Sequence, residues 1–152
     1  MKFNVSDYPL SFKRQVFLYE TDAFGHTNNV TFFQYMESAR FELMKELSLF
    51  DPSDILSCNF ILTHAECDYR QISRYNDTLV IYSRISQIKT SSFVIENLMI
   101  NEKTRNLVAT GKVVLVSHLN ANPLPAFTNM PGLILPWVGV NRQMWRNLWI
   151  KS

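Results

Sequence analysis

Hydrophobic residues between positions 29 and 48 recur at helical spacing, three or four residues apart. The residues that share one face of the expected helix are Phe32, Met36, Ala39, Leu43 and Leu47. Pro52 follows soon afterwards, and proline disfavours helical backbone in the residue before it. The pattern therefore predicts an amphipathic helix from about Asn29 to about Ser48.

Five other segments have the composition or the alternation of β-strands. They are residues 13–20 before the expected helix and residues 59–72, 78–88, 91–100 and 106–119 after it. The connections at 89–90 and 101–105 are short enough for hairpins, so neighbouring strands are expected to be antiparallel. One long helix and five strands predict an α+β domain in which the sheet wraps the helix.

The chain of 152 residues can bury one substantial core. We expect a single domain over 1–152, with its core at about 10–120 and a proline-rich, Trp-bearing extension at about 122–152. A short helix is expected within that extension at 141–150, docked on its own domain or on a subunit partner. A small sheet also leaves unpaired edges, and pairing with a second copy would cover them.

Composition and charge exclude several classes of protein. Hydrophobic residues make up 47% and aromatic residues 13% of the chain, which is typical of a globular protein. A net charge of +2 with no basic run does not indicate a nucleic-acid partner. The sequence contains no signal peptide and no apolar stretch long enough for a membrane span, so we expect a cytoplasmic protein. Cys58 and Cys67 have neither metal-ligand spacing nor the density of a disulfide scaffold.

The candidate chemistry lies in the polar, turn-forming residues just before the helix. Asn28 or Asn29 can cap the helix, because an Asn side chain accepts from an N–H group of the first turn. Asp22 precedes this helix start, where free backbone N–H groups favour negative charge. A carboxylate close to such a site suggests a reaction that develops an oxyanion.

These residues also carry a family resemblance. The stretch TDAFGHTNN followed by FFQYMESAR resembles the Asp-x-x-Gly-His-x-Asn-Asn…Tyr…Glu-x-Ala-Arg signature of hot-dog-fold acyl-CoA thioesterases, the 4-hydroxybenzoyl-CoA thioesterase family. Residues 69–77 are similar to the family's Tyr-x-x-Pro-x-Arg-x-x-Asp passage, with Ile72 in the place of the proline. The resemblance covers about residues 10–120.

The resemblance implies a hot-dog fold, with one long central helix wrapped by a five- to six-stranded antiparallel sheet. It also implies homodimers or homotetramers with active sites at the subunit interface, and hydrolysis of an acyl-CoA without metal or cofactor. By position in the motif, Asp22 matches the catalytic carboxylate and Gly25 matches the turn glycine. Asn29 matches the helix-start residue whose backbone N–H contacts the thioester carbonyl.

Each candidate has alternative roles. Asp22 can be a general base, a nucleophile that forms a mixed anhydride, or a purely structural turn residue. His26 can be a base or a loop residue that orients the turn. Glu37 is a rival catalytic carboxylate about two helical turns after Asn29, or an ion-pair partner of Arg40. Asn28 can contact substrate or act only as a cap.

The leading prediction is an acyl-CoA thioesterase, with Arg74 and Lys89 as candidates for contacts to the CoA phosphates. Three alternatives stay open: a thioesterase for acyl carrier protein, a hydratase or dehydratase that uses Asp22 and His26, and a non-catalytic acyl-CoA-binding module. The three histidines have no metal-ligand spacing, so no metal site is expected.

Overall fold

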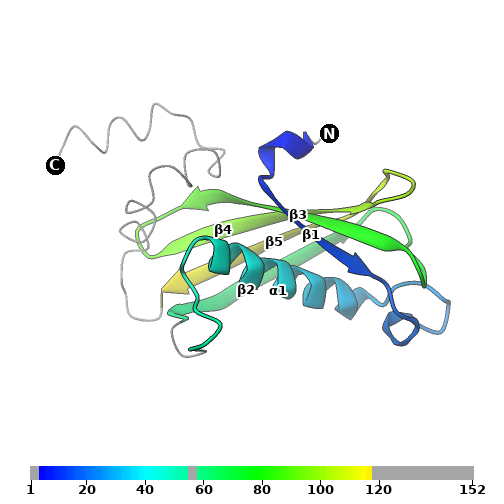
Figure 1. Ribbon diagram of the computed structural model, residues 1–152, viewed down its shortest axis with the longest axis horizontal. Coiled ribbons are helices and arrows are strands. Elements are labelled where there is room, and N and C mark those ends of the chain that lie inside the picture. The colour runs from blue at the N-terminus through cyan, green and yellow to red at the C-terminus, as the bar shows by residue number, and fades with distance from the viewer. Residues whose placement is uncertain (1–3, 55–57, 118–152) are drawn as a thin grey trace.

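The computed structural model describes residues 4–54 and 58–117, and the predicted C-terminal extension lies outside these residues. The elements in chain order are η1 (Val5–Asp7), β1 (Leu10–Gln15), η2 (Leu18–Glu20), α1 (Asn29–Glu46), β2 (Phe60–Tyr69), β3 (Thr78–Ile88), β4 (Ser92–Asn101) and β5 (Leu107–Ser117). Figure 1 shows α1 lying across one face of a curved sheet.

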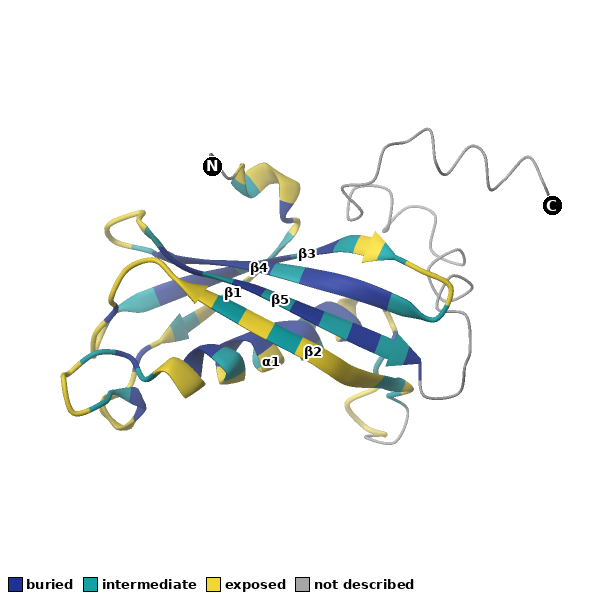
Figure 2. Cartoon of the chain, turned by 180° about the vertical axis from the view of Figure 1, so that it is seen from behind, coloured by how far each residue is buried: buried dark blue, intermediate teal, exposed yellow. Residues whose placement is uncertain are grey.

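All strand pairs of the five-stranded sheet are antiparallel, in the order β1-β3-β4-β5-β2. The expected α+β architecture, with one long helix on an antiparallel sheet, is confirmed. β1 and β2 form the two edges of the sheet, and β2 is exposed along most of its length (Figure 2).

The core lies between α1 and the inner face of the sheet. All five residues that were expected to share one helix face are buried. Leu79, Ile81 and Ile85 of β3 are also buried and pack against the helix in two adjoining clusters. The hydrophobic periodicity of the helix therefore predicts its side of the core correctly.

The first predicted strand is wrong in its bounds. The sheet pairing of β1 begins at Leu10 and ends at Gln15, and residues 18–20 form a 3-10 turn instead of continuing the strand. The Glu20 carboxylate accepts a hydrogen bond from the Phe17 N–H at 2.8 Å, and such local side-chain bonds compete with strand pairing.

Helix α1 ends at Glu46, two residues before the predicted end at about Ser48. Ser48 has a left-handed backbone with φ of 54°, and the Leu49 N–H donates to the Met44 carbonyl at 2.8 Å. This is a Schellman ending, which closes the helix after Glu46. The other strand boundaries lie within three residues of the predicted ones where they are described.

Candidate active site

Asp22 organises the turn that leads into α1. Its Oδ1 atom accepts hydrogen bonds from the Phe24 N–H at 2.9 Å and the His26 N–H at 3.1 Å. Its backbone N–H donates to the His26 carbonyl at 2.8 Å. Gly25 has a φ of 73°, a left-handed conformation that favours glycine, and allows the chain to reverse there. No hydrogen bond to Asp22 Oδ2 is formed by the described residues, so one carboxylate oxygen shapes the turn and the other is free.

The two ends of the turn meet at the start of α1. Thr21 and Thr27 form an isolated β-bridge, which brings the two ends of the turn side by side. The Asn28 N–H then donates to the Glu20 carbonyl at 2.8 Å. Asp22 is therefore held on a short loop whose ends meet immediately before the first residue of α1.

The start of α1 leaves one backbone donor open. Asn28 is the N-cap, and its Oδ1 accepts from the Val30 N–H at 3.0 Å. The Thr31 N–H donates to the Asn28 carbonyl at 3.0 Å. Within residues 4–54 and 58–117, no acceptor contacts the Asn29 N–H. An N–H group in this position can stabilise a developing oxyanion.

The segment before β3 supports the turn from the other side. The Thr27 N–H donates to the Ser73 carbonyl at 2.8 Å, and the hydroxyls of the same two residues lie 2.7 Å apart. His26 and Arg74 form a second isolated β-bridge, so Arg74 lies beside the Asp22 turn. The structure thus brings together Asp22, Gly25, His26, Asn28, Asn29 and Arg74.

Lys89 lies elsewhere in the chain. The Asp22 turn adjoins the start of β3, whereas Lys89 follows its last residue, Ile88. The 11 residues of this strand span roughly 35 Å. Within one chain, Lys89 is therefore not grouped with the other candidate residues.

Glu37 projects from α1 about two turns beyond its start. Its Oε1 accepts from Arg40 Nη2 at 3.1 Å, which is the ion pair expected as its alternative role. Arg40 is only 7% exposed, and burial lowers the pKa of its guanidinium group while the Glu37 carboxylate opposes that shift. The Arg40 guanidinium also lies over the Phe41 ring, at 5.3 Å from the ring centroid.

One buried carboxylate next to the site, Glu20, was not predicted from the sequence. Glu20 is 6% exposed, and its Oε2 accepts from the Tyr35 hydroxyl at 2.7 Å. Burial, and secondarily this hydrogen bond to Glu20, raises the pKa of Tyr35 well above its usual range. Glu20 and Tyr35 therefore tie the loop that carries Asp22 to the second turn of α1. The signal available in the sequence was a Glu directly before the motif and a Tyr at its helical positions.

We expect Tyr35→Phe to lower the free energy of unfolding by about 1.5–3 kcal/mol, because it removes a hydrogen bond to a buried charged group. Urea denaturation of the variant and the wild type measures this difference. Tyr19→Phe is the matched control, since Tyr19 is 79% exposed and should change stability by less than about 0.5 kcal/mol. Equal losses in the two variants would contradict the assigned role of Tyr35.

A groove begins beside the open donor. It has a volume of about 180 Å³ and runs along α1 between the helix and β2. The residues that line it are Val30, Phe33, Gln34, Met36, Glu37, Arg40, Leu62, Ala65 and Val113. Val30 belongs to the first turn of α1, so the groove reaches the start of the helix.

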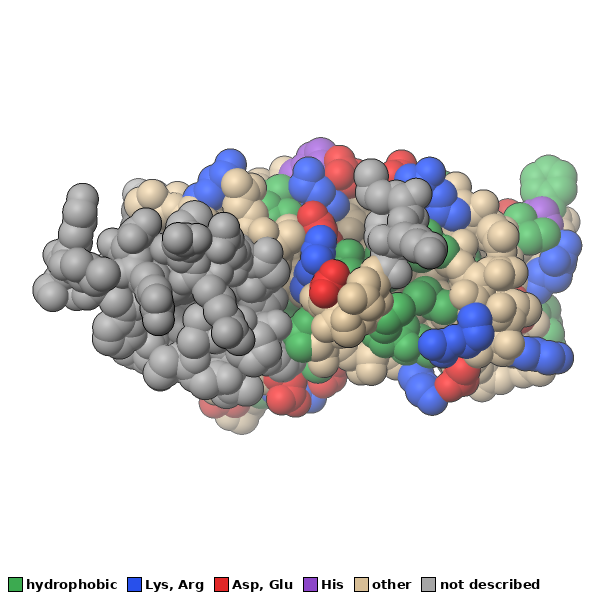
Figure 3. All heavy atoms as spheres, turned by 90° about the horizontal axis from the view of Figure 1, so that it is seen from above, with side chains coloured by type: hydrophobic (Ala, Val, Ile, Leu, Met, Phe, Trp, Pro, Cys, Tyr) green, Lys and Arg blue, Asp and Glu red, His purple; other side chains and the backbone are tan. Residues whose placement is uncertain are grey.

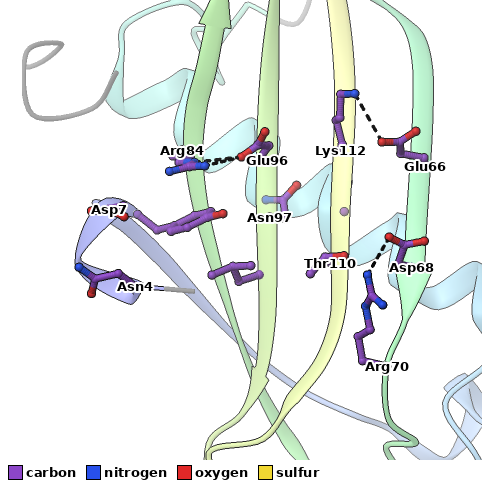
Figure 4. Close-up of a pocket in the computed structure, with 13 residues that line it drawn as sticks. Asn4, Asp7, Glu66, Asp68, Arg70, Arg84, Glu96, Asn97, Thr110 and Lys112 are labelled. Atoms are coloured by element: carbon purple, nitrogen blue, oxygen red, sulfur yellow. Dashed lines mark hydrogen bonds and ion pairs between the residues drawn. The ribbon is translucent and has the colours of Figure 1, made fainter. Parts of the chain in front are cut away.

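A larger cavity of about 500 Å³ lies on the other face of the sheet, beside the N-terminal segment. Figure 4 shows two of its ion pairs running between neighbouring strands. Arg84 Nη2 lies 2.7 Å from Glu96, and Lys112 lies 3.5 Å from Glu66. In the view of Figure 3, blue and red side chains alternate on this side of the molecule. The cavity is lined by neither Asp22 nor Asn29, so it is separate from the Asp22 turn and the start of α1.

The described part of the chain contains no cluster of three or more histidine, cysteine, aspartate or glutamate side chains that could hold a metal ion. None of its helices is both long enough and apolar enough to cross a bilayer.

Comparisons with known proteins identify a family and a fold. The sequence model of the thioesterase-like superfamily matches residues 16–134. The uncharacterized protein YsmA of Bacillus subtilis is 37% identical over 98 residues, which are 64% of this chain and 64% of YsmA. The crystal structure of Slr0204, a 1,4-dihydroxy-2-naphthoyl-CoA thioesterase from Synechocystis, matches with a TM-score of 0.69 at 21% identity, covering 81% of this chain and 96% of that one. The structure of a thioesterase from Thermus thermophilus, complexed with coenzyme A and Zn, matches with a TM-score of 0.64 at 25% identity, covering 73% and 80%. The expected hot-dog fold is confirmed by these structural matches.

Proposed function

This chain belongs to the thioesterase-like superfamily and is a thioester hydrolase, and we propose that it hydrolyses an acyl-CoA to the free acid and CoA. One observation carries the proposal. Among the described residues, the Asp22 carboxylate on the loop closed by the Thr21–Thr27 bridge has one oxygen without a hydrogen bond, and the helix that follows has an N–H without an acceptor on Asn29. Attack on a thioester needs a group that activates or supplies a nucleophile and a donor for the carbonyl oxygen.

The reaction follows from these two groups. The thioester carbonyl oxygen accepts a hydrogen bond from the Asn29 N–H, which stabilises the negative charge of the tetrahedral intermediate. Asp22 Oδ2 either takes a proton from an attacking water or attacks the carbonyl carbon itself and forms a mixed anhydride. The C–S bond then breaks, and the CoA sulfur leaves as a thiolate that is protonated. In the anhydride route, water subsequently releases the acid and regenerates the Asp22 carboxylate.

The choice of CoA as the carrier is supported by two observations. Slr0204 is a CoA thioesterase by its name, and the Thermus thioesterase was crystallised with coenzyme A. In this chain, the exposed Arg74 lies next to the Asp22 turn, where its guanidinium can contact a CoA phosphate. An acyl group on a carrier protein would present the same thioester and is the second candidate substrate.

A thiol-release assay tests the activity. We expect turnover of acyl-CoAs of several chain lengths, and slower turnover of the same acyl groups on acyl carrier protein. Faster turnover of the acyl groups on acyl carrier protein would identify the carrier protein, instead of CoA, as the preferred carrier. Binding of acyl-CoA without thiol release would instead favour a non-catalytic binding module, and addition of water to an enoyl-CoA would favour a hydratase.

We also propose that the working unit is a homodimer formed through the β2 edge. This strand has one hydrogen-bonded neighbour, β5, and its other edge is open among the described residues. Ile61 and Leu62 on β2 are 53% and 43% exposed, which is unusual for large apolar side chains along a free edge. The groove opens toward this edge, because Leu62 and Ala65 form one of its walls. A second copy would therefore close the groove.

We expect Ile61→Lys to weaken dimerisation by tenfold or more, because the two-fold pairing of identical edges places like charges close together. Sedimentation velocity over a range of concentrations measures the shift from dimer to monomer. Leu18→Lys is a control at a site that is 68% exposed but lies outside the sheet. An unchanged dimer in Ile61→Lys would place the subunit contact on another surface.

A further inference from the structure

Met36 forms part of the floor of the groove and is itself almost fully buried, with 1% of its surface exposed. It belongs to the cluster that includes Phe32, Tyr35 and Met99, which leaves little room on those sides. Protein cores are close-packed, so a buried side chain that is displaced moves toward the available open space. For Met36, that space is the groove.

Gly111 on β5 determines where the Met36 side chain can lie. Its inner face is directed at α1, and a Cβ atom placed there would overlap Met36 Sδ. The same Cβ would lie 3.2 Å from Met36 Cγ and 3.5 Å from Met36 Cε. The thioether of Met36 thus fills the position that any side chain at residue 111 would take. Gly111 has no left-handed φ, so close approach and not backbone conformation explains the glycine here.

We propose that Gly111 and Met36 together determine the depth of the acyl groove and thereby the length or bulk of the acyl group that the enzyme accepts. Because Gly111 lacks a side chain, Met36 can lie back against the sheet and leave the groove open. Met36 is seven residues after Asn29, so its place on the helix is about 10 Å beyond the carbonyl site. The pair therefore acts on the distal part of an acyl group and leaves short acyl groups unaffected. This inference rests on the proposed function of the same site.

Two substitutions are expected to change the depth of the groove in opposite directions. Gly111→Ala forces the Met36 thioether toward the groove, so we expect the ratio of kcat/KM for dodecanoyl-CoA over butyryl-CoA to fall by about tenfold or more. Met36→Ala deepens the floor, so the same ratio should rise. In the double variant, the new Cβ of residue 111 occupies space that Met36 has vacated, and the ratio should return toward the wild-type value.

The ratio is measured within one protein preparation, so it does not depend on the fraction of each variant that is folded. Met99→Ala is the matched control, because Met99 is buried in the same cluster but does not line the groove. We expect it to lower stability without changing the ratio. An unchanged ratio in Met36→Ala, or an equal change in Met99→Ala, would overturn the proposal.

Calorimetric binding of non-hydrolysable dodecyl and butyl thioether analogues of acyl-CoA separates this inference from the proposed activity. The affinity ratios should follow the same order across the variants. If the affinity ratios of the variants follow this order but the wild type releases no thiol from any acyl-CoA, the proposed hydrolysis is wrong and the groove assignment is retained. If thioesters are hydrolysed and neither ratio responds to Gly111→Ala or Met36→Ala, the groove assignment is wrong and the hydrolysis is retained.

Discussion

Asp22→Asn is expected to reduce kcat for acyl-CoA hydrolysis by about a hundredfold or more, which is the usual scale of a lost acid–base group. The asparagine Oδ1 can still accept from the Phe24 and His26 N–H groups, so the turn keeps its shape. The other carboxylate oxygen is replaced by an uncharged NH2 group, which is neither a base nor a nucleophile. We therefore expect KM to change by a few-fold at most, since the substrate contacts remain. Thiol release under saturating substrate measures kcat.

Glu37→Gln is the matched carboxylate control for Asp22→Asn. It weakens the ion pair with Arg40 but leaves the Asp22 carboxylate and the Asn29 N–H unchanged, so we expect kcat within a few-fold of the wild type. The opposite result, a large loss in Glu37→Gln with Asp22→Asn near normal, would transfer the catalytic role to the helix carboxylate. Single-turnover hydrolysis in ¹⁸O-labelled water then distinguishes the general-base route from an anhydride that water opens at the Asp22 Cγ atom. That opening leaves an unlabelled Asp22 oxygen in the first product and places the label on Asp22, whereas the general-base route places the label in the product.

Local patterns in the sequence are sufficient for much of this architecture. The helix face is a periodic feature, and the turn is built from bonds between residues 22 and 26. Asn28 caps the helix through its neighbour Val30. Each of these interactions spans only a few residues, so spacing and residue type are enough to predict them.

Non-local contacts explain what was missed. Residues 13–20 have strand-like composition, but pairing with β3 ends at Gln15 and Glu20 turns inward to meet Tyr35. The contact of Gly111 with Met36 depends on the register of β5 against the helix. No spacing rule in the sequence relates those two positions. The same holds for Lys89, whose distance from the Asp22 turn follows from the direction of β3.

The second large effect is expected at the start of the helix. Asn29→Pro removes the one backbone N–H that we assign to the oxyanion, and nothing else can substitute for it at that position. The loss of such a donor typically costs about 3–4 kcal/mol in transition-state stabilisation, so kcat should fall by roughly a hundredfold to a thousandfold. Proline is well suited to this position, because Asn29 is the first helical residue, where proline is favoured. Asn28 before it has φ of −60° and ψ of 139°, an extended conformation that a following proline accepts.

Asn29→Ala completes the test, because alanine keeps the backbone N–H and removes only the side chain. We expect this variant to retain activity within a few-fold of the wild type. Circular dichroism and thermal unfolding establish whether Asn29→Pro keeps α1 intact, so that a loss of rate can be assigned to the missing donor. If the folded proline variant hydrolyses acyl-CoA as fast as the alanine variant, the carbonyl oxygen is not held at the helix start. In that case Asp22 would have to act on a thioester carbonyl that is bound elsewhere. The groove that begins at Val30 would then no longer be the expected binding place of the acyl chain.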